Sequence, residues 1–402
     1  MLIGLVGRPS SGKSTFFKAA TLADVLIANY PFTTIKPNRA MAYVKIKDLA
    51  VEFNKHSNPR EGFVKGDFRF VPFELVDVAG LVEGASEGKG LGNQFLDDLA
   101  SADALIMVVD MSGETDAEGK QTEGYYPGKD IEMIESELDK WYLGIFRKVW
   151  GAFARTVKMQ KKKFSEAVAK QFSGLKVAEE DVEFVVRKLS IDVENPDRWS
   201  ADDLMKFARI LRKETKPIII AGNKMDRPDS EKNYEKIKKE FDYPIVPCFA
   251  DGELSLRQAD KVGLINYIPG DDDFKILSLK DNSDNKSNLL LSDKQLEALE
   301  KIKKIMSKYG STGVQEVLNK AVFDVLKYIA VYPAGAKLSD NKGNVLPDCF
   351  LMPPNSTALD FAFRLHSDIG KSFVKAIDVK TKKGVGKDYV LKNGDGLEIM
   401  TR

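Results

Sequence analysis

The sequence predicts an α/β protein with a doubly wound, mostly parallel sheet that a long helical insertion interrupts. Apolar stretches that read as buried strands alternate with helix-like stretches, near residues 2–6, 70–77, 104–110, 217–222 and 245–249. The distance between Gly80 and Asn223 is too long for one helix and one strand, so an insertion is expected there. In such a sheet the ligand binds at the carboxyl ends of the strands.

The composition is that of an ordinary soluble protein. The formal net charge of +1 argues neither for nor against an anionic partner. Only local clusters of charge can therefore indicate whether the protein binds one. Cys248 and Cys349 are too few and too far apart for a disulfide framework or a zinc cluster, which fits a reducing compartment. The N-terminal apolar run breaks at Gly7, too early for a signal peptide or a membrane span. We therefore expect a cytoplasmic protein with neither a membrane nor DNA as partner.

The segment GRPSSGKST, from Gly7 to Thr15, matches the pattern G-x-x-x-x-G-K-[ST] between a strand and a helix. Glycines let successive N–H groups point at an anion, and the helix N-terminus adds partial positive charge. Lys13 would reach the β- and γ-phosphates of a nucleotide, and the Ser14 hydroxyl would bind Mg²⁺. The alternative is a glycine-rich turn without a ligand. The predicted phosphate-binding residues are Arg8, Pro9, Ser10, Ser11, Gly12, Lys13, Ser14 and Thr15.

A second apolar strand, in PIIIAGNKMD, ends in Asn223-Lys224-Met225-Asp226, which resembles the N-K-x-D guanine-recognition motif of GTPases. The Asp226 carboxylate can accept hydrogen bonds from guanine N1–H and from the exocyclic N2 amine. Adenine has no such donor pair, and a buried carboxylate without donors is costly, so adenine is rejected. Asn223 would tie this loop to the phosphate-binding loop, and the Lys224 stem would cover the base. A polar turn after a strand is the alternative.

Two further segments have the chemistry of nucleotide-sensing switches. FELVDVAG ends a strand with Asp77-Val78-Ala79-Gly80, where Asp77 would orient the Mg²⁺ shell and the Gly80 N–H would meet the γ-phosphate. In NYPFTTIKPN, Thr33 or Thr34 would close on Mg²⁺ and the γ-phosphate, and we favour Thr34. The predicted catalytic residues are Lys13, Thr34, Asp77 and Gly80, and the predicted metal ligands are Ser14, Thr34 and Asp77.

These motifs together resemble the Obg-like family of GTPases, and its YchF-type branch in an archaeal-looking form. The stretches NYPFTTI and DVAGLVEGA are far more specific than the phosphate-binding loop, and GKGLGN follows them. The C-terminal stretches VYPAGAKLSDNKG, STALDFAFRLHSDIG and YVLKNGDGLEI resemble a TGS domain, a ubiquitin-like β-grasp module of translation-associated proteins. The resemblance implies a P-loop NTPase G domain, GTP and GDP as ligands with Mg²⁺, and a TGS domain.

The resemblance also implies a role for the turn after the last strand. The Ala250 N–H would contact guanine O6, and Phe249 replaces the serine that related proteins usually have before this alanine. Some YchF-type proteins have a changed base motif and accept ATP, whereas this chain keeps N-K-x-D. Potassium-activated relatives have asparagine where Ser10 stands. Leu81 occupies the position where many GTPases have a water-orienting glutamine.

The predicted organisation has a G domain in two parts around a helical, coiled-coil-like insertion, then a helical connector with Ser292 as its N-cap, and the TGS domain. In chain order these five segments are 1–130, 131–214, 215–280, 281–324 and 325–402.

Charge is strongly segregated within the insertion. Residues 143–176 contain nine Lys/Arg and one acidic residue, whereas 177–203 contain nine acidic residues and three basic ones. One interpretation is an antiparallel helical hairpin whose arms pair charges across solvent. The other is a basic arm that contacts ribosomal RNA phosphates. Residues 371–392, with seven lysines, are a second candidate contact for RNA or ribosomal protein.

The sequence therefore predicts a Mg²⁺-dependent GTP-binding and GTP-hydrolysing switch, with the ribosome or ribosomal RNA as partner through the TGS domain and the basic arm. Two alternatives remain open. One is a nucleotide-gated binding module with negligible intrinsic hydrolysis, because Leu81 has no group that could orient water. The other is an ATPase of the same fold.

Overall fold

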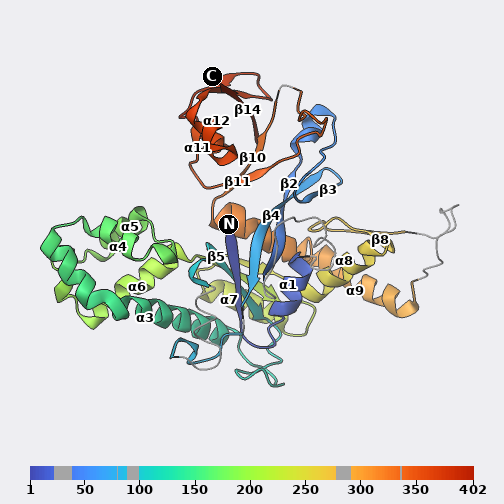
Figure 1. The fold of residues 1–402 in the computed structure, drawn as a ribbon. Helices are drawn as coiled ribbons and strands as arrows, with labels where there is room; N and C mark the ends of the chain where they lie inside the picture. Colours follow the sequence, from blue (N-terminus) through green and yellow to red (C-terminus); the bar gives the residue numbers. More distant parts are fainter. Residues whose placement is uncertain (22–38, 79, 88–98, 278–290, 336) are drawn as a thin grey trace.

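The computed structural model describes residues 1–21, 39–78, 80–87, 99–277, 291–335 and 337–402 (Figure 1). Thr33, Thr34 and the GKGLGN stretch lie outside the described residues. Figure 1 shows a central sheet with its helices, an arm of helices to one side, and a small C-terminal domain above the sheet. None of the helices in the described ranges is long and apolar enough to cross a membrane.

The central sheet has the strand order β2-β4-β1-β5-β6-β7, with β3 paired to β4. Strands β4, β1, β5, β6 and β7 are parallel to one another, and β2 and β3 are antiparallel to β4. The strands are β1 Leu2–Gly7, β2 Arg39–Lys47, β3 Phe63–Lys65, β4 Phe68–Asp77, β5 Ala104–Asp110, β6 Ile218–Asn223 and β7 Ile245–Pro247. The predicted doubly wound sheet is confirmed. The sequence did not reveal β2 and β3, because β2 contains three cations and β3 is only three residues long.

Helices cover both faces of this sheet, which is why its parallel strands read as continuous apolar runs. One face packs against α1, α8, α10 and the π-helix η7. The other packs against α7 and against two helices of the arm, α3 (Gly128–Gln160) and α6 (Ala201–Thr215). The Ser292 hydroxyl accepts a hydrogen bond from Gln295 N, which confirms the predicted N-cap of α9. The bounds are α1 Lys13–Thr21, α7 Ser230–Glu240, α8 Ala250–Lys261, α9 Asp293–Tyr309, α10 Val314–Asn319 and η7 Lys320–Val325, with a small hairpin of β8 Ile265–Asn266 and β9 Lys275–Ile276.

The arm consists of α3 Gly128–Gln160, α4 Phe164–Gln171, α5 Glu179–Leu189 and α6 Ala201–Thr215. Its core is aromatic: the rings of Phe146 and Phe172 stack with centroids 3.9 Å apart, and Trp150 packs beside them. Lys161, with φ of +48°, ends α3, so the apolar face that the sequence shows as one stripe is divided between two helices. Helix α3 starts beside the sheet and continues unbroken into the arm, so the predicted boundary at 130/131 falls inside it.

The contacts within the arm support parts of both interpretations of its charge. Lys163 forms ion pairs with Glu179 and with Glu183, and Lys158 pairs with Asp197 at 2.9 Å. Other cations of the basic segment are exposed and form no ion pair with any described residue. These are Arg147, Lys148, Arg155, Lys161, Lys162 and Lys170. Charge pairing therefore neutralises some cations of the arm and leaves others exposed.

The C-terminal domain is a separate sheet of order β11-β10-β14-β12-β13, with helices on one face. Its elements are β10 Ile329–Pro333, β11 Phe350–Met352, α11 Ala358–Leu365, α12 Ser367–Lys371, β12 Phe373–Asp378, β13 Gly384–Val385 and β14 Asp395–Thr401. Phe361 of α11 is buried among strand residues such as Val331 and Leu397. The mixed sheet packed on a helix is the predicted β-grasp arrangement.

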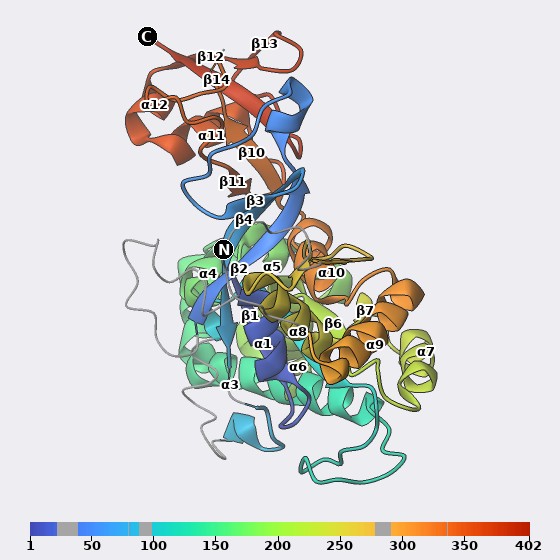
Figure 2. The ribbon, with the colours of Figure 1, turned by 90° about the vertical axis from the view of Figure 1, so that its right-hand side faces the viewer.

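This domain sits on the far end of β2 and β4, which reach from the central sheet up to it (Figure 2). The short helix Leu49–Phe53 after β2 contributes Leu49 and Ala50 to an apolar cluster with Tyr332. Arg69, at the start of β4, is 1% exposed and donates to the carbonyls of Leu346 at 2.8 Å and Pro347 at 2.9 Å.

Candidate functional site

The carboxyl ends of the parallel strands meet at one edge of the sheet, where β1 ends at Gly7, β4 at Asp77 and β6 at Asn223. Between β1 and α1, Gly12 has φ of +86°, and a Cβ atom on it would lie 2.2 Å from Asn223 Nδ2. Only glycine fits there, because the loop after β6 approaches so closely. A cavity of about 290 Å³ opens beside this turn, lined by Arg8, Pro9, Ser10, Gly12, Lys13, Ser14, Thr15 and Gly80.

Asp77 brings the phosphate-binding loop and the D-x-x-G segment together. Its Oδ1 accepts from the Lys13 ammonium, and the Ser14 hydroxyl donates to Oδ2 at 3.2 Å. A serine hydroxyl and a carboxylate are hard oxygen donors, the kind that Mg²⁺ prefers alongside phosphate oxygens. The donor set at this position therefore fits a magnesium ion, with Ser14 and Asp77 as the residues that could hold it.

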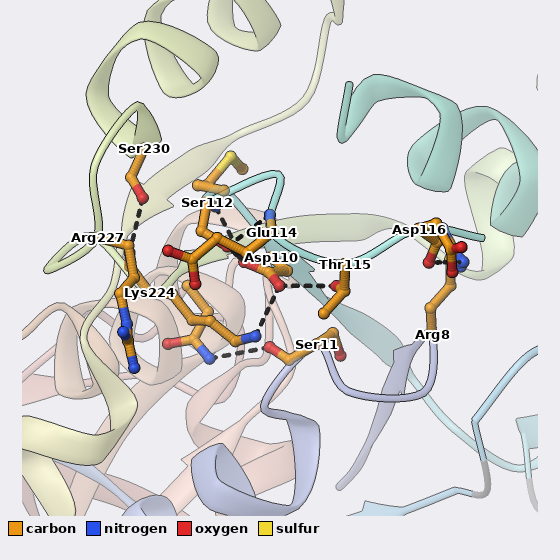
Figure 3. Close-up of polar contacts among 12 residues, drawn as sticks. Arg8, Ser11, Asp110, Ser112, Glu114, Thr115, Asp116, Lys224, Arg227 and Ser230 are labelled. Carbon is orange, nitrogen blue, oxygen red and sulfur yellow. Dashed lines mark hydrogen bonds and ion pairs between the residues drawn. The ribbon is translucent and has the colours of Figure 1, made fainter. Parts of the chain in front are cut away.

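The Arg8 side chain turns away from the predicted phosphate position, although its backbone lies in the loop. The guanidinium is 4% exposed, and it donates to the Asp130 carboxylate at the start of α3 and to Tyr125 OH at 2.8 Å. It also donates to the Asp116 carbonyl at 2.5 Å (Figure 3). Burial raises the pKa of Asp130, whereas the bonds from Tyr125 and Arg8 favour its charged form. Arg8 thus anchors the phosphate-binding loop to α3 and to the loop after β5.

The loop after β6 is held by its own side chains. Asn223 Nδ2 donates to the Ser11 carbonyl at 3.0 Å, so the predicted tie between the two loops is present. Lys224 has φ of +63°, and its ammonium donates to Asp110 Oδ2 at 2.6 Å (Figure 3). Its carbonyl accepts from the Ser230 hydroxyl at 2.8 Å.

Asp226 has few partners of its own. Its carboxylate is 26% exposed and makes one ion pair with the described residues, to Arg227 Nε at 3.4 Å. Burial raises its pKa; Arg227 lowers it, and the charges of Asp251 and Glu114 raise it further. A half-buried carboxylate with one long contact has acceptor capacity left for donors of a ligand.

Phe249 and Ala250 begin α8 beside this loop. The Phe249 N–H donates to the Thr312 carbonyl at 2.8 Å, and its ring packs over Gly252 rather than at Asp226. The Ala250 N–H donates to Asn223 Oδ1 at 3.1 Å. If the Ala250 N–H contacts guanine O6 as predicted, it has to donate to both oxygens at once or give up its bond to Asn223.

Gly80 and Leu81 follow Asp77 on the phosphate side. Gly80 stands against Pro9, where a Cβ atom would meet the proline nitrogen at 3.1 Å, and the Leu81 N–H donates to the Gly7 carbonyl at 3.0 Å. The Leu81 side chain is 1% exposed in the core with Val78 and Leu99. It faces away from solvent, which agrees with its having no part in orienting water.

Sequence reasoning did not identify two carboxylates at this edge of the sheet, Asp110 and Asp130. Asp110 accepts from Lys224, Ser112 and Thr115 Oγ1, and Asp130 receives Arg8. The one available signal was that Asp110 ends a wholly apolar strand, where a carboxylate is unexpected unless it has partners. No motif marks Asp130, which lies 122 residues from Arg8 in sequence.

An edge of this kind, with a phosphate loop and an N-K-x-D loop bonded to each other, defines the class of P-loop GTP-binding proteins. Residues 2–141 match the family described as 50S ribosome-binding GTPase, residues 221–335 match the Obg-like GTPase YGR210-like, G4 motif-containing domain, and residues 331–401 match the TGS domain. The chain belongs to the Obg-like GTPase family, of the YGR210-like kind, with a C-terminal TGS domain.

Relatives span the whole chain. An uncharacterized GTP-binding protein of Methanocaldococcus jannaschii is 45% identical over 100% of this chain and 99% of its own. One of Schizosaccharomyces pombe is 38% identical over 89% of this chain and 88% of its own. The crystal structure of a GTP binding protein from Pyrococcus horikoshii OT3, 38% identical, covers 100% of both chains with a TM-score of 0.78. The predicted family and fold are confirmed.

Proposed function

We propose that this protein is a Mg²⁺-dependent switch that binds GTP, hydrolyses it to GDP and phosphate, and reports its state through contacts with the ribosome or RNA. The observation that carries the proposal is the direct bond from Asn223 to Ser11, which sets the base-motif loop beside the phosphate loop. One nucleotide can then span from Lys13 to Asp226. A G domain in two parts around a helical insertion that begins with α3, a helical connector, a TGS domain and a cytoplasmic location belong to the same proposal.

In this proposal each group has a separate task. Lys13 exchanges its bond to Asp77 for the β- and γ-phosphates, and the loop N–H groups from Arg8 to Thr15 surround them. Ser14, Asp77 and Thr34 hold the metal, which when bound neutralises phosphate charge. The Gly80 N–H meets the γ-phosphate. At the other end Asp226 accepts from the base, with Asn223, Lys224, Phe249 and Ala250 around it.

Turnover of variants in the phosphate loop tests this assignment. Lys13→Ala and Ser14→Ala should each abolish most Mg²⁺-dependent phosphate release from GTP while the circular dichroism spectrum is retained. Lys18→Ala, on the exposed side of the same helix, is the matched control and should behave like the wild type. Wild-type turnover in both loop variants would remove the site assignment.

Base choice is the point at which relatives diverge. A ribosome-binding ATPase YchF of Buchnera aphidicola is 25% identical over 99% of this chain and 98% of its own. Because this chain has Asp226 in an N-K-x-D loop, we propose GTP rather than ATP as its nucleotide. A competition titration with both nucleotides decides this, and equal affinities would favour the ATPase.

The ribosome or RNA is proposed as partner because cations of the arm remain exposed without acidic partners, and because 371–392 of the TGS domain is lysine-rich. Names of the matched family and of YchF relatives point the same way. Co-sedimentation with ribosomal subunits should weaken steeply with salt and fall in Lys161→Glu/Lys162→Glu, but not in Lys232→Glu on α7. Equal co-sedimentation of all three proteins would contradict a role for the arm.

The burial of Leu81 favours a second candidate, a nucleotide-gated binding module with negligible intrinsic hydrolysis. Leu81 itself has no group that could orient the attacking water. Measuring GTP turnover with and without ribosomal subunits separates the two functions. Strong stimulation supports the GTPase switch, and bound GTP that is never hydrolysed supports the module.

A further inference from the structure

Asp110, the last residue of β5, has a set of partners that no motif explains. The carboxylate is 4% exposed, and its Oδ1 accepts from Ser112 N at 2.9 Å and from Ser112 Oγ at 2.6 Å. Its Oδ2 accepts from Thr115 Oγ1 at 3.0 Å and from Lys224 Nζ at 2.6 Å (Figure 3). The loop after β5 therefore holds this carboxylate at the position where Lys224 binds it.

The ion pair between Lys224 and Asp110 affects the base site, because a second carboxylate lies close to Lys224 in sequence. Asp226 follows two residues later, and its one ion pair with the described residues is the long one to Arg227 at 3.4 Å. An ammonium on a flexible stem, released next to a half-buried carboxylate, would pair with it, since charge-assisted bonds are strongest away from water. Such a pair would occupy the acceptor positions that the N1–H and N2 amine of guanine require.

We propose that Asp110 is a positioning residue for guanine selection: by holding the Lys224 ammonium it keeps the Asp226 carboxylate free to accept from the base. The inference rests on the proposed function, because it assumes that Asp226 reads guanine. It adds a requirement that the N-K-x-D motif does not state, namely a carboxylate at the end of the neighbouring strand.

Selectivity between GTP and ITP tests this directly, because hypoxanthine lacks only the N2 amine that Asp226 would accept from. Dissociation constants of GTP, ITP and ATP are measured for the wild type, Asp110→Asn and Asp110→Asn/Lys224→Met. The wild type should prefer GTP to ITP by about tenfold to a hundredfold, the scale of one hydrogen bond to a charged group. In Asp110→Asn the preference should fall to about threefold or less. The double variant has no ammonium to occupy Asp226 and should regain the preference.

Two further variants separate positioning from general damage. Ser230→Ala removes the bond to the Lys224 carbonyl but leaves the ammonium paired, so its GTP-to-ITP ratio should equal that of the wild type. Thr115→Val removes one bond to Asp110 and should lower the ratio partially, which keeps the inference testable if Asp110→Asn does not fold. An unchanged ratio in Asp110→Asn, or in Thr115→Val where the first is unfolded, overturns the inference.

The remaining outcomes are equally informative. A double variant that stays unselective shows that release of Lys224 is not the cause, and the inference is wrong while the proposed function stands. A wild type that binds ITP or ATP as tightly as GTP contradicts the proposed base specificity itself, and the inference falls with it.

Discussion

At the scale of single residues, the base-motif loop combines tightly bonded side chains with one that has few partners. Asn223 and Lys224 are bonded to the phosphate loop and to β5, whereas Asp226 makes one ion pair with the described residues, at 3.4 Å. Burial raises the pKa of Asp226 despite the opposing effects of its own backbone N–H and of Arg227, so its charged form would gain stabilisation from further donors. A ligand that brings two N–H donors would supply it.

Exchange of this carboxylate for an amide should change the preferred base. Asp226→Asn would place an NH₂ group against a guanine N–H, a clash of donors, whereas the C2 carbonyl of xanthine can accept from it. GTP affinity should fall by about 2–4 kcal/mol, a lost charged hydrogen bond plus an unpaired buried group, and XTP should gain relative affinity. Competition titration of GTP, XTP and ATP on both proteins measures this. A variant without any shift toward XTP would show that Asp226 does not read the base.

Leu81 should matter for stability more than for chemistry. Its side chain is 1% exposed in the core, so Leu81→Ala should destabilise the fold by about 2–5 kcal/mol through lost burial and a cavity. Turnover per folded molecule should change only modestly, because leucine cannot polarise water. Denaturant unfolding and GTP turnover check the two statements. Val82→Ala, at a side chain 39% exposed, is the neighbouring control and should lie within about 0.5 kcal/mol of the wild type.

At the scale of elements, α3 is the helix that joins the phosphate side of the site to the arm. Asp130 in its first turn receives Arg8 of the phosphate loop. Two turns on, Glu137 accepts from Ser86 N at 2.9 Å and Ser86 Oγ at 2.7 Å, in the segment after D-x-x-G. Since α3 continues unbroken into the arm, both segments are attached to one helix that leaves the G domain.

The bond between Glu137 and Ser86 should appear in acid unfolding. Burial disfavours the charged Glu137, but hydrogen bonds from Ser86 and Lys140 outweigh it and lower the pKa to about 2. Below pH 4.5 the unfolded chain therefore binds more protons at this residue than the folded one, and stability falls as the pH falls toward 2. The contribution at neutral pH is up to about 3 kcal/mol.

Glu137→Gln should remove this part of the acid dependence. Unfolding free energies measured between pH 7 and 3 should differ most from those of the wild type near neutrality and converge as the pH falls. Glu132→Gln, at an exposed glutamate of the same helix, should follow the wild type within about 0.5 kcal/mol. A constant difference at every pH would mean that Glu137 acts through packing rather than charge.

At the scale of the whole molecule, the TGS domain is docked by a largely buried contact. Arg69 satisfies two carbonyls of the 346–347 segment, and the apolar cluster around Leu49 and Tyr332 surrounds the contact. Strand β4, Phe68–Asp77, carries Arg69 at one end and Asp77 at the other, so one strand connects the docked domain to the phosphate site. The position of the TGS domain is thus set by the same strand that ends at the proposed metal ligand.

Loss of the Arg69 guanidinium should loosen this docking. Arg69→Met leaves the buried Leu346 carbonyl without a donor, whereas the Pro347 carbonyl keeps the Arg60 N–H at 3.0 Å, so the change should cost about 1–3 kcal/mol. Limited proteolysis around residues 326–329 and thermal unfolding measure the effect. Arg60→Ala breaks exposed ion pairs to Asp340 and Asp348 at the same interface and should cost at most about 1 kcal/mol. Equal effects of the two changes would assign the docking to surface charge.

The sequence by itself determined the features that depend on contiguous residues. Apolar runs placed the parallel strands, and the backbone requirements of the phosphate loop appear as Gly7, Gly12 and Lys13 within one short segment. The loops that carry Asp77 and Asp226 were located in the same way. Local patterns suffice here because strand burial and turn conformation are decided by neighbours in the chain.

Only the tertiary structure decided which side chains meet. Arg8 turned to Asp130, 122 residues away, rather than to the predicted phosphate position, and Lys224 paired with Asp110, 114 residues away. The Arg69 guanidinium donates to the carbonyl of Leu346, 277 residues away in the sequence. A lysine or arginine side chain is long enough to reach many acceptors. Its partner depends on which carboxylate or carbonyl the fold buries within hydrogen-bond distance. That information is absent from any single segment, because it arises only when strands and helices distant in sequence pack together.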